Sequence, residues 1–353
     1  MARDLKSNPG RGTRHNPPNR FTPLYYVRDQ DWADEDDPAP RTQVFRDASR
    51  SILSHNDSPD VGFDVSVNPY RGCEHGCIYC YARPTHEYLG FSAGLEFEHN
   101  ILIKQDAAEL LKKALGSPRW QPQPIIFSGV TDAYQPLERR LQLTRQCLDV
   151  LRAFRNPVVI ITKNHLVTRD LDLLAELARF DAAMVYLSIT TLDATLCRKL
   201  EPRTSVPERR LAAIERVAAA GVPVGVLVSP VIPGLNDHEV PSILQAAQQA
   251  GARYAGSMPV RLPHAVGPLF EQWLSEHYPT KKSKILNRIK AMRGGQLNDP
   301  RFGLRMRGEG IFAQQLRDLF RLSCRKVGIH AHGPTLSTEA FQVPGQAQLN
   351  LFP

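Results

Sequence analysis

Three of the six cysteines in this chain of 353 residues lie within one stretch of eight residues, at Cys73, Cys77 and Cys80. Thiolates are soft ligands that suit zinc ions and iron–sulfur clusters. A closed structural metal site takes four protein ligands, whereas a catalytic site leaves one coordination position open. Gly72 and Gly76 allow the backbone to curve closely around a bulky inorganic group. The loop therefore predicts a redox-active metal centre with one open position.

The other three cysteines are spread along the chain in segments that we expect to be helices. Cys147, Cys197 and Cys324 are too far apart in sequence to suggest a disulfide framework, and we interpret them as small core residues. No apolar run approaches the ~20 residues of a membrane helix. The first residues, MARDLKSNPG, lack the apolar centre of a signal peptide. These features predict a soluble, cytoplasmic protein without a membrane partner.

Short β-branched or apolar runs alternate with helical patterns through the middle of the chain. The helical pattern at 137–154 places Leu137, Leu141, Leu148 and Leu151 on one stripe. A later helix is predicted to begin with a capping box at Ser205 and Glu208 and to stop at Gly221. Strands that are apolar on both faces indicate a buried parallel sheet. The predicted strands are residues 64–70, 124–130, 157–162, 183–189, 222–229 and 252–260.

Six such units predict an α/β fold, a partial (β/α)6 TIM-like barrel, rather than a two-way Rossmann sheet. No glycine-rich dinucleotide motif follows the first strand. We expect a flexible N-terminal segment at 1–45, the barrel at 46–265, a basic α-helical extension at 266–332 and a flexible tail at 333–353.

The basic charge is concentrated in one segment. Residues 281–330 contain 13 Lys or Arg and three acids, a net charge of +10, so the rest of the chain sums to −2. A segment of this kind suits a phosphate-bearing partner such as nucleic acid. A solvated helical surface has the same composition, and charge alone does not separate the two.

The C-x3-C-x-aromatic-C loop, which includes Tyr79, resembles the loop of the radical S-adenosylmethionine (SAM) superfamily. The resemblance covers roughly residues 60–265. It extends to a branch related to spore photoproduct lyase and often labelled DNA repair photolyase. It implies a [4Fe-4S] cluster on the three loop cysteines, with SAM on the open iron. It further implies an external electron donor of the flavodoxin or ferredoxin type, and reductive cleavage of SAM to a 5′-deoxyadenosyl radical.

Polar residues follow successive predicted strands, where ligand sites of such barrels lie. Ser128, Thr131 and Asp132 resemble the segment that receives the SAM amino group, although the usual Gly-Gly-Glu is absent. Ser188 and Thr190 offer hydroxyls, and Glu201 and Arg203 resemble the pair that contacts the ribose and carboxylate. The resemblance also assigns Tyr79 to the site, and the segment with Ile232 and Gly234 to the adenine. Candidate catalytic residues are Lys163, Tyr134 and Cys197.

Alternative readings remain open. His75 or His86 would complete a closed Cys3His zinc site, which would make the chain a zinc-stabilised, non-catalytic binding module. Ser128, Thr131 and Ser188 also suit simple loop caps. Spore photoproduct lyase uses a cysteine as hydrogen donor, and neither Cys197 nor Cys324 is a clear equivalent. The substrate is therefore a nucleic acid or, alternatively, a peptide or small metabolite.

The chain ends in a short apolar peptide. Gln348, Leu349, Leu351 and Phe352 resemble the motif by which bacterial DNA-repair proteins bind the sliding clamp. A flexible tail would place the two last apolar side chains in a groove.

Overall fold

The computed structural model describes residues 10–22, 41–127 and 129–345. Its centre is a seven-stranded sheet in the order β10-β9-β8-β7-β6-β3-β2. All pairs from β3 to β10 are parallel, and β2 is an antiparallel edge strand. The strands are β2 (Leu53–His55), β3 (Val65–Val67), β6 (Ile125–Phe127), β7 (Val158–Thr162), β8 (Ala183–Ser188), β9 (Val224–Val231) and β10 (Tyr254–Pro259). Each of the six predicted strands is present.

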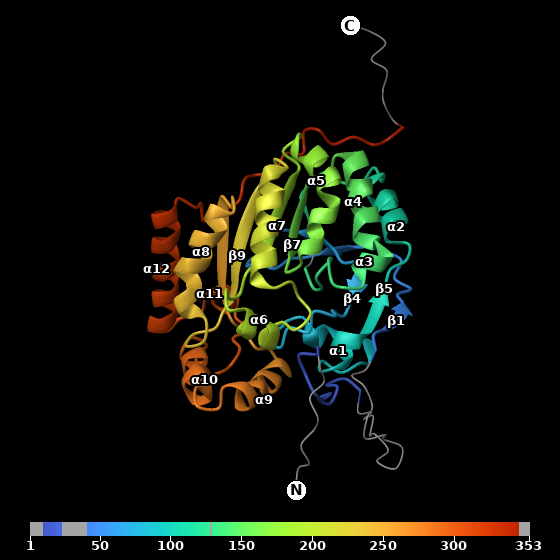
Figure 1. Ribbon diagram of the computed structural model, residues 1–353. Coiled ribbons are helices and arrows are strands. Elements are labelled where there is room, and N and C mark those ends of the chain that lie inside the picture. Colours follow the sequence, from blue (N-terminus) through green and yellow to red (C-terminus); the bar gives the residue numbers. More distant parts are fainter. Residues whose placement is uncertain (1–9, 23–40, 128, 346–353) are drawn as a thin grey trace.

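Helices cover the outer face of this sheet and leave the carboxyl ends of the strands at one end of the molecule (Figure 1). They are α2 (Ala107–Leu115), α4 (Leu143–Phe154), α5 (Leu171–Ala178), α7 (Pro207–Ala219) and α8 (Val240–Gln249). Their inner faces and the strands form one core of Val, Leu, Ile and Ala side chains. Short elements occupy several loops between strand and helix: α3 (Glu138–Leu141), η2 (His165–Asp170), α6 (Ala194–Leu200) and η3 (Asp237–Glu239).

A small second sheet carries the cysteine loop. Its order is β1 (Gln43–Arg46), β5 (Asn100–Ile103) and β4 (Tyr70–Arg71). The loop follows β4 and leads into η1 (Arg83–Leu89) and α1 (Glu96–His99). The cysteine loop thus begins at the end of a strand that is paired outside the main sheet.

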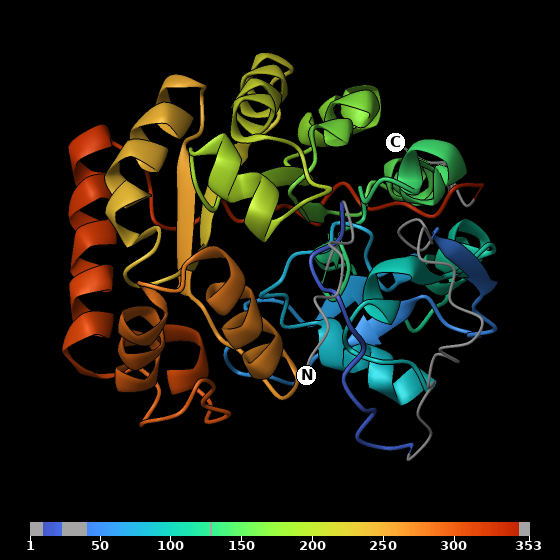
Figure 2. The ribbon, with the colours of Figure 1, turned by 60° about the horizontal axis from the view of Figure 1, so that its bottom comes forward.

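The C-terminal extension is helical. It contains α9 (Val266–His277), α10 (Lys282–Ala291), α11 (Leu304–Arg307) and α12 (Gly310–Val327). Helices α9 and α10 lie at the end where the strands finish, whereas α12 runs alongside α8 (Figures 1 and 2). Among the described residues, none of the helices is long and apolar enough to cross a membrane.

Two local predictions were wrong. The helix predicted at 137–154 is broken at Gln142, which has a φ of 55°. The break lets Leu141 pack near Tyr70 in a separate apolar cluster, while Leu148 joins the main core. The capping box is also absent: Val206 is the N-cap of α7, and no side chain caps its first turn. The Ser205 hydroxyl instead accepts a hydrogen bond from the His165 amide at 2.9 Å.

Parts of both terminal segments are bound to the body of the protein. Near the C-terminus, Ser337 and Gln342 donate backbone hydrogen bonds of 2.9 Å to the carbonyls of Asp181 and Phe154. At the N-terminus, the Gly12 amide donates to Glu98 at 2.8 Å. The flexibility of the two terminal segments stays a prediction. The peptide Gln348 to Phe352, which resembles a clamp-binding motif, lies outside the described residues.

Candidate active site

The cysteine loop is held on two sides by backbone hydrogen bonds. The Cys73 amide donates to the Phe97 carbonyl at 2.9 Å, and the Ile78 amide donates to Leu200 at 3.0 Å. Gly76 has a φ of 66°, and a Cβ there would lie 2.8 Å from the carboxylate of Glu98. The loop therefore requires glycine at this position.

Cys73 and Cys80 are close enough to Cys77 to affect its ionisation. Burial raises the pKa of Cys77 well above its usual value, and Glu201, Cys80 and Cys73 raise it further. Burial and Cys73 also raise the pKa of Cys80. Bound iron would offset the mutual repulsion of the three thiolates, because it supplies positive charge among them. The residues present therefore fit the iron–sulfur cluster that the sequence resemblance implies.

The two loop histidines are engaged elsewhere. His75 Nδ1 lies 3.4 Å from the Asp132 carboxylate, and its Nε2 lies 3.3 Å from the Asn164 amide nitrogen. Burial lowers the pKa of His75, but Asp132 and Cys73 raise it to about 9, and a protonated imidazole does not bind metal. His86 Nε2 contacts the Asn100 carbonyl at 2.9 Å. In the part of the chain that is described, no three His, Cys, Asp or Glu side chains surround a single ion position.

Glu201 is the centre of a buried hydrogen-bond network next to the cysteine loop. It accepts hydrogen bonds from the Tyr79 hydroxyl, from Thr190 Oγ1 at 2.5 Å, and from the Arg210 guanidinium. Burial alone would raise the pKa of Glu201, but Arg210 and then Lys163 lower it to about 2. Glu201 is therefore a buried anion that fixes the positions of Tyr79 and Thr190.

Arg210 belongs to the Glu201 network, and the sequence did not lead us to predict it. It is buried on α7 and donates to the carbonyls of Ser188 and Ser205, each at 2.7 Å. Its spacing to the buried residues Ala213, Ile214 and Val217 places it on the apolar face of α7. A charged residue in a core-facing position was the signal that was available. Arg203, which the resemblance names with Glu201 as a contact of SAM, pairs with Glu74 at 3.2 Å.

The segment after β6 is mostly built into the scaffold. Thr131 Oγ1 donates to the Tyr70 carbonyl at 2.9 Å, and the Tyr134 hydroxyl donates to Asp170 at 3.1 Å. Asp132 accepts hydrogen bonds from Thr162 Oγ1 at 2.7 Å and from the Lys163 amide at 2.8 Å. Thr131 and Asp132 thus tie this loop to its neighbours. Ser128 lies outside the described residues.

Lys163, which follows β7, is a second cation near the cysteine loop, besides Arg210. Its Nζ lies 6.0 Å from the centroid of the Tyr79 ring, and among the described residues this ammonium makes no hydrogen bond or ion pair. Burial lowers the pKa of Lys163, but Glu201 and then Cys77 raise it, with a net increase. Because its charge lies near the cysteine loop without a hydrogen-bond partner, Lys163 is able to bind an anionic ligand group.

The remaining predicted residues lie around this centre. Ile232 is buried, and its amide donates to Asn236 Oδ1 at 2.6 Å, while Asn236 Nδ2 donates to the Thr190 carbonyl at 2.7 Å. Gly234 turns the chain there with a φ of 87°. Cys197 is buried behind Glu201, 3.8 Å from Oε2, and burial raises its pKa to about 11. Ser188 is buried at the end of β8.

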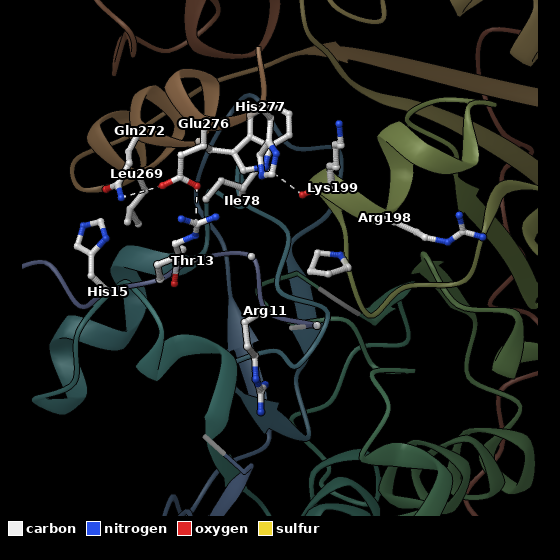
Figure 3. A pocket seen from close by; sticks show the side chains of 15 residues that line it. Arg11, Thr13, His15, Ile78, Arg198, Lys199, Leu269, Gln272, Glu276 and His277 are labelled. Carbon is white, nitrogen blue, oxygen red and sulfur yellow. Dashed lines mark hydrogen bonds and ion pairs between the residues drawn. The ribbon is translucent and has the colours of Figure 1, made fainter. Parts of the chain in front are cut away.

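A hollow of about 200 Å³ adjoins the cysteine loop at Ile78 (Figure 3). The N-terminal segment, the end of α6 and helix α9 form its walls. Arg14 pairs with Glu276 across it at 3.3 Å, and Trp273 donates to the Lys199 carbonyl at 3.1 Å. Figure 2 shows α9 beside the N-terminal segment at this end of the molecule.

The chain belongs to the radical SAM superfamily, whose family model matches residues 67–247. It is therefore a radical SAM enzyme, and the superfamily implies an iron–sulfur cluster and SAM. An uncharacterised protein of Mycobacterium tuberculosis is 35% identical over 292 residues, which cover 81% of this chain and 82% of that protein. An uncharacterised protein of Methanocaldococcus jannaschii is 31% identical and covers 50% of this chain and 64% of its own length.

Among solved structures, spore photoproduct lyase complexed with dinucleoside spore photoproduct has a similar fold. The TM-score is 0.61 at 18% identity, and the match covers 82% of this chain and 81% of that chain. A doubly substituted mutant of that lyase, with bound AdoMet and dinucleoside spore photoproduct, has a TM-score of 0.60 at 19% identity and covers 82% of this chain and 80% of that chain. These likenesses confirm the predicted partial barrel.

Proposed function

We propose that this enzyme binds a 4Fe–4S cluster through Cys73, Cys77 and Cys80, and uses it with SAM to act on a nucleic acid. When bound, the cluster and SAM supply reductive cleavage and a 5′-deoxyadenosyl radical, with the electron delivered by an external donor of the flavodoxin or ferredoxin type. The observation that carries the proposal is one loop with three thiols, of which Cys73 and Cys80 raise the pKa of Cys77, beside the Lys163 ammonium, which makes no hydrogen bond or ion pair among the described residues.

The side chains around the loop have distinct proposed roles. Lys163 binds the SAM carboxylate, since it is a cation without a partner among the described residues. Glu201 is a positioning residue, because Tyr79, Thr190 and Arg210 occupy its oxygens. The turn at Ile232 to Gly234 receives the adenine with backbone and apolar atoms. Arg203, Ser188 and Thr190 line the remaining SAM site in this proposal.

The nucleic-acid part rests on the fold and on the charge of the C-terminal extension. The related lyase binds a dinucleoside photoproduct, and this chain shares its fold. Within the described residues, seven of the 13 basic side chains at 281–330 are paired or hydrogen-bonded. The six without such a partner are Lys281, Lys284, Lys290, Arg307, Arg325 and Lys326. These unpaired side chains are free to contact phosphates.

Anaerobic reconstitution tests the first part. We expect the iron and sulfide of one cluster per chain, with dithionite-dependent conversion of SAM to 5′-deoxyadenosine. In the Cys77→Ala variant, both the bound iron and sulfide and the conversion of SAM should fall to background, because the cluster then lacks one of its three protein ligands. Cys147→Ala, a substitution in the core away from the loop, is the matched control and should keep both. Bound zinc without iron, or SAM cleavage by the Cys77→Ala variant, would refute the proposal.

A further inference from the structure

Arg261 lies beside the cysteine loop. Its guanidinium has no hydrogen-bond acceptor or carboxylate partner among the described residues. It lies two residues beyond β10, and its guanidinium carbon is 4.5 Å from the centroid of the Tyr81 ring. Tyr81 directly follows Cys80. Within the described residues Arg261 makes no hydrogen bond or ion pair, and its Nε is buried without any acceptor. Leaving a buried donor unpaired carries the full desolvation penalty of that group, so this arrangement favours binding of an acceptor.

Ionisable groups of both signs surround Arg261, but none of them pairs with it among the described residues. Burial lowers the pKa of Arg261, and Arg305 lowers it further, whereas Tyr81 and Asp60 raise it. Asp60 is already occupied, since it accepts hydrogen bonds from Arg305 Nε at 2.6 Å and from the Gly303 amide at 2.5 Å. Arg293, which also lies near Arg261, donates to the carbonyls of Val260 and Arg305. Because a guanidinium pairs best with carboxylate or phosphate oxygens, the partner that Arg261 lacks among the described residues is an anion.

A second pair of an arginine and an aromatic ring lies next to the first. Arg305 stacks over Phe302 with its guanidinium carbon 4.5 Å from the ring centroid, and Phe302 is 61% exposed. Tyr81 is 39% exposed. Exposed rings flanked by arginines are the usual platform for unstacked bases, because every base has a π face and every nucleotide carries a phosphate.

We propose that Arg261 binds a phosphate of a single-stranded nucleic acid while Tyr81 and Phe302 stack bases next to it. This inference rests on the proposed nucleic-acid substrate and specifies where it binds. A phosphate at Arg261 places its nucleotide beside Cys80, at the end of the barrel where the radical is generated. Single strands fit better than duplexes, since bases inside a duplex are already stacked and do not reach side-chain rings.

Binding is tested without SAM, so that it is independent of radical chemistry. The probe is a fluorescein-labelled single-stranded DNA of about ten nucleotides, with fluorescence anisotropy measured on the reconstituted protein. Arg261→Gln should weaken binding about tenfold. It should also reduce the slope of log K against log salt by about 0.7, since one phosphate contact is lost. Phe302→Ala should weaken binding about tenfold with an unchanged slope, because an uncharged stacking contact is lost.

The matched control is Arg253→Gln, an exposed arginine just before β10, at the opposite end of that strand. It should bind as the wild type does. Equal affinity of the wild-type, Arg261→Gln and Phe302→Ala proteins would overturn the inference. So would full displacement of the probe by stoichiometric SAM, because Arg261 would then hold the SAM carboxylate. A labelled RNA and a duplex of the same sequence are the comparison arms, and tighter binding of the duplex would also contradict the proposal. An enzyme that binds the probe as expected but does not cleave SAM would instead refute only the proposed function.

Discussion

Among single residues, Glu201 is a fully buried carboxylate at the centre of the site. A buried carboxylate is costly unless its charge is compensated and its oxygens are hydrogen-bonded. Arg210 supplies the opposite charge, and Tyr79 and Thr190 supply hydroxyl donors. Tyr79 directly precedes Cys80, the last cysteine of the loop. By holding the Tyr79 hydroxyl, the Glu201 carboxylate therefore also fixes the position of the loop. Stability and site geometry are therefore linked at Glu201.

Glu201→Gln should destabilise the protein by about 3–5 kcal/mol at neutral pH, because Arg210 is left as an uncompensated buried cation. Denaturant unfolding under anaerobic conditions measures this. The folded-state pKa of Glu201 is about 2, below its usual value of 4.5. Its ionisation therefore stabilises the fold fully above pH 4.5, and this contribution is lost as the pH falls towards 2.

The stability difference between the wild type and Glu201→Gln should accordingly shrink across that acid range. Glu215→Gln, on the exposed side of the same helix α7, is the control and should change stability little. A difference that stays constant as the pH falls would mean that Glu201 does not carry the charge assigned to it.

Some residues of the candidate site could be predicted from the sequence, and others could not. The three cysteines could be predicted because their close spacing by itself indicates a metal centre. Glu201 was predicted from the family resemblance. Arg210 was missed because a lone arginine within an amphipathic helix is normally exposed. Its role depends on Ser188 and Ser205, residues from other elements, whose carbonyls it reaches only in the folded chain.

At the scale of elements, the N-terminal segment is packed against the cysteine loop. The Gly12 and Thr13 amides donate to the two oxygens of Glu98 at 2.8 and 3.0 Å, and Arg83 binds the same carboxylate at 2.6 Å. A Cβ on Gly12 would lie 1.7 Å from the Gly76 carbonyl oxygen. The segment therefore covers the loop only if residue 12 has no side chain.

Gly12→Ala should expose the proposed cluster. Overpacking of this kind costs about 1–3 kcal/mol, which multiplies the population of an opened segment by about 5- to 150-fold. We expect faster bleaching of the reconstituted cluster in air, followed by visible absorbance. Gly62→Ala is the control, since a Cβ at that exposed glycine meets no atom within 4 Å. Equal bleaching rates for both variants would show that the segment does not protect the cluster.

The strands of the main sheet could be predicted from the sequence. The contacts that hold the N-terminal segment against the cysteine loop could not. A strand buried on both faces is mostly apolar, and β7, β8 and β9 have that composition. The N-terminal segment is held instead by backbone amides on Glu98 and by close contact at Gly12. Neither leaves a periodic pattern in the sequence, so the segment was predicted to be flexible. The break at Gln142 escaped prediction for a related reason, because Leu137 and Leu148 serve two different cores.

Over the whole molecule, the basic C-terminal extension is not one continuous surface. Helix α10 lies at the end where the strands finish, and α12 runs away from it along α8 (Figure 1). The last turn of α12 is followed by His330, which pairs with Tyr254 at the beginning of β10. Arg325 and Lys326 are therefore at the far end of the barrel from the cysteine loop, although the sequence grouped them with the lysines of α10.

Because the basic residues lie at two ends of the molecule, the same change of charge should affect DNA binding differently at the two ends. Lys281→Glu combined with Lys284→Glu should weaken binding of single-stranded DNA about tenfold, a loss of about 1.4 kcal/mol, because both unpaired side chains lie at the end that holds the site. Arg325→Glu combined with Lys326→Glu makes the same change of net charge at the far end. That variant should bind nearly as the wild type does at physiological salt, where charges separated by more than ~8 Å are screened. Anisotropy titrations at two salt concentrations measure both variants. Equal losses would mean that net charge, rather than a located surface, attracts the nucleic acid.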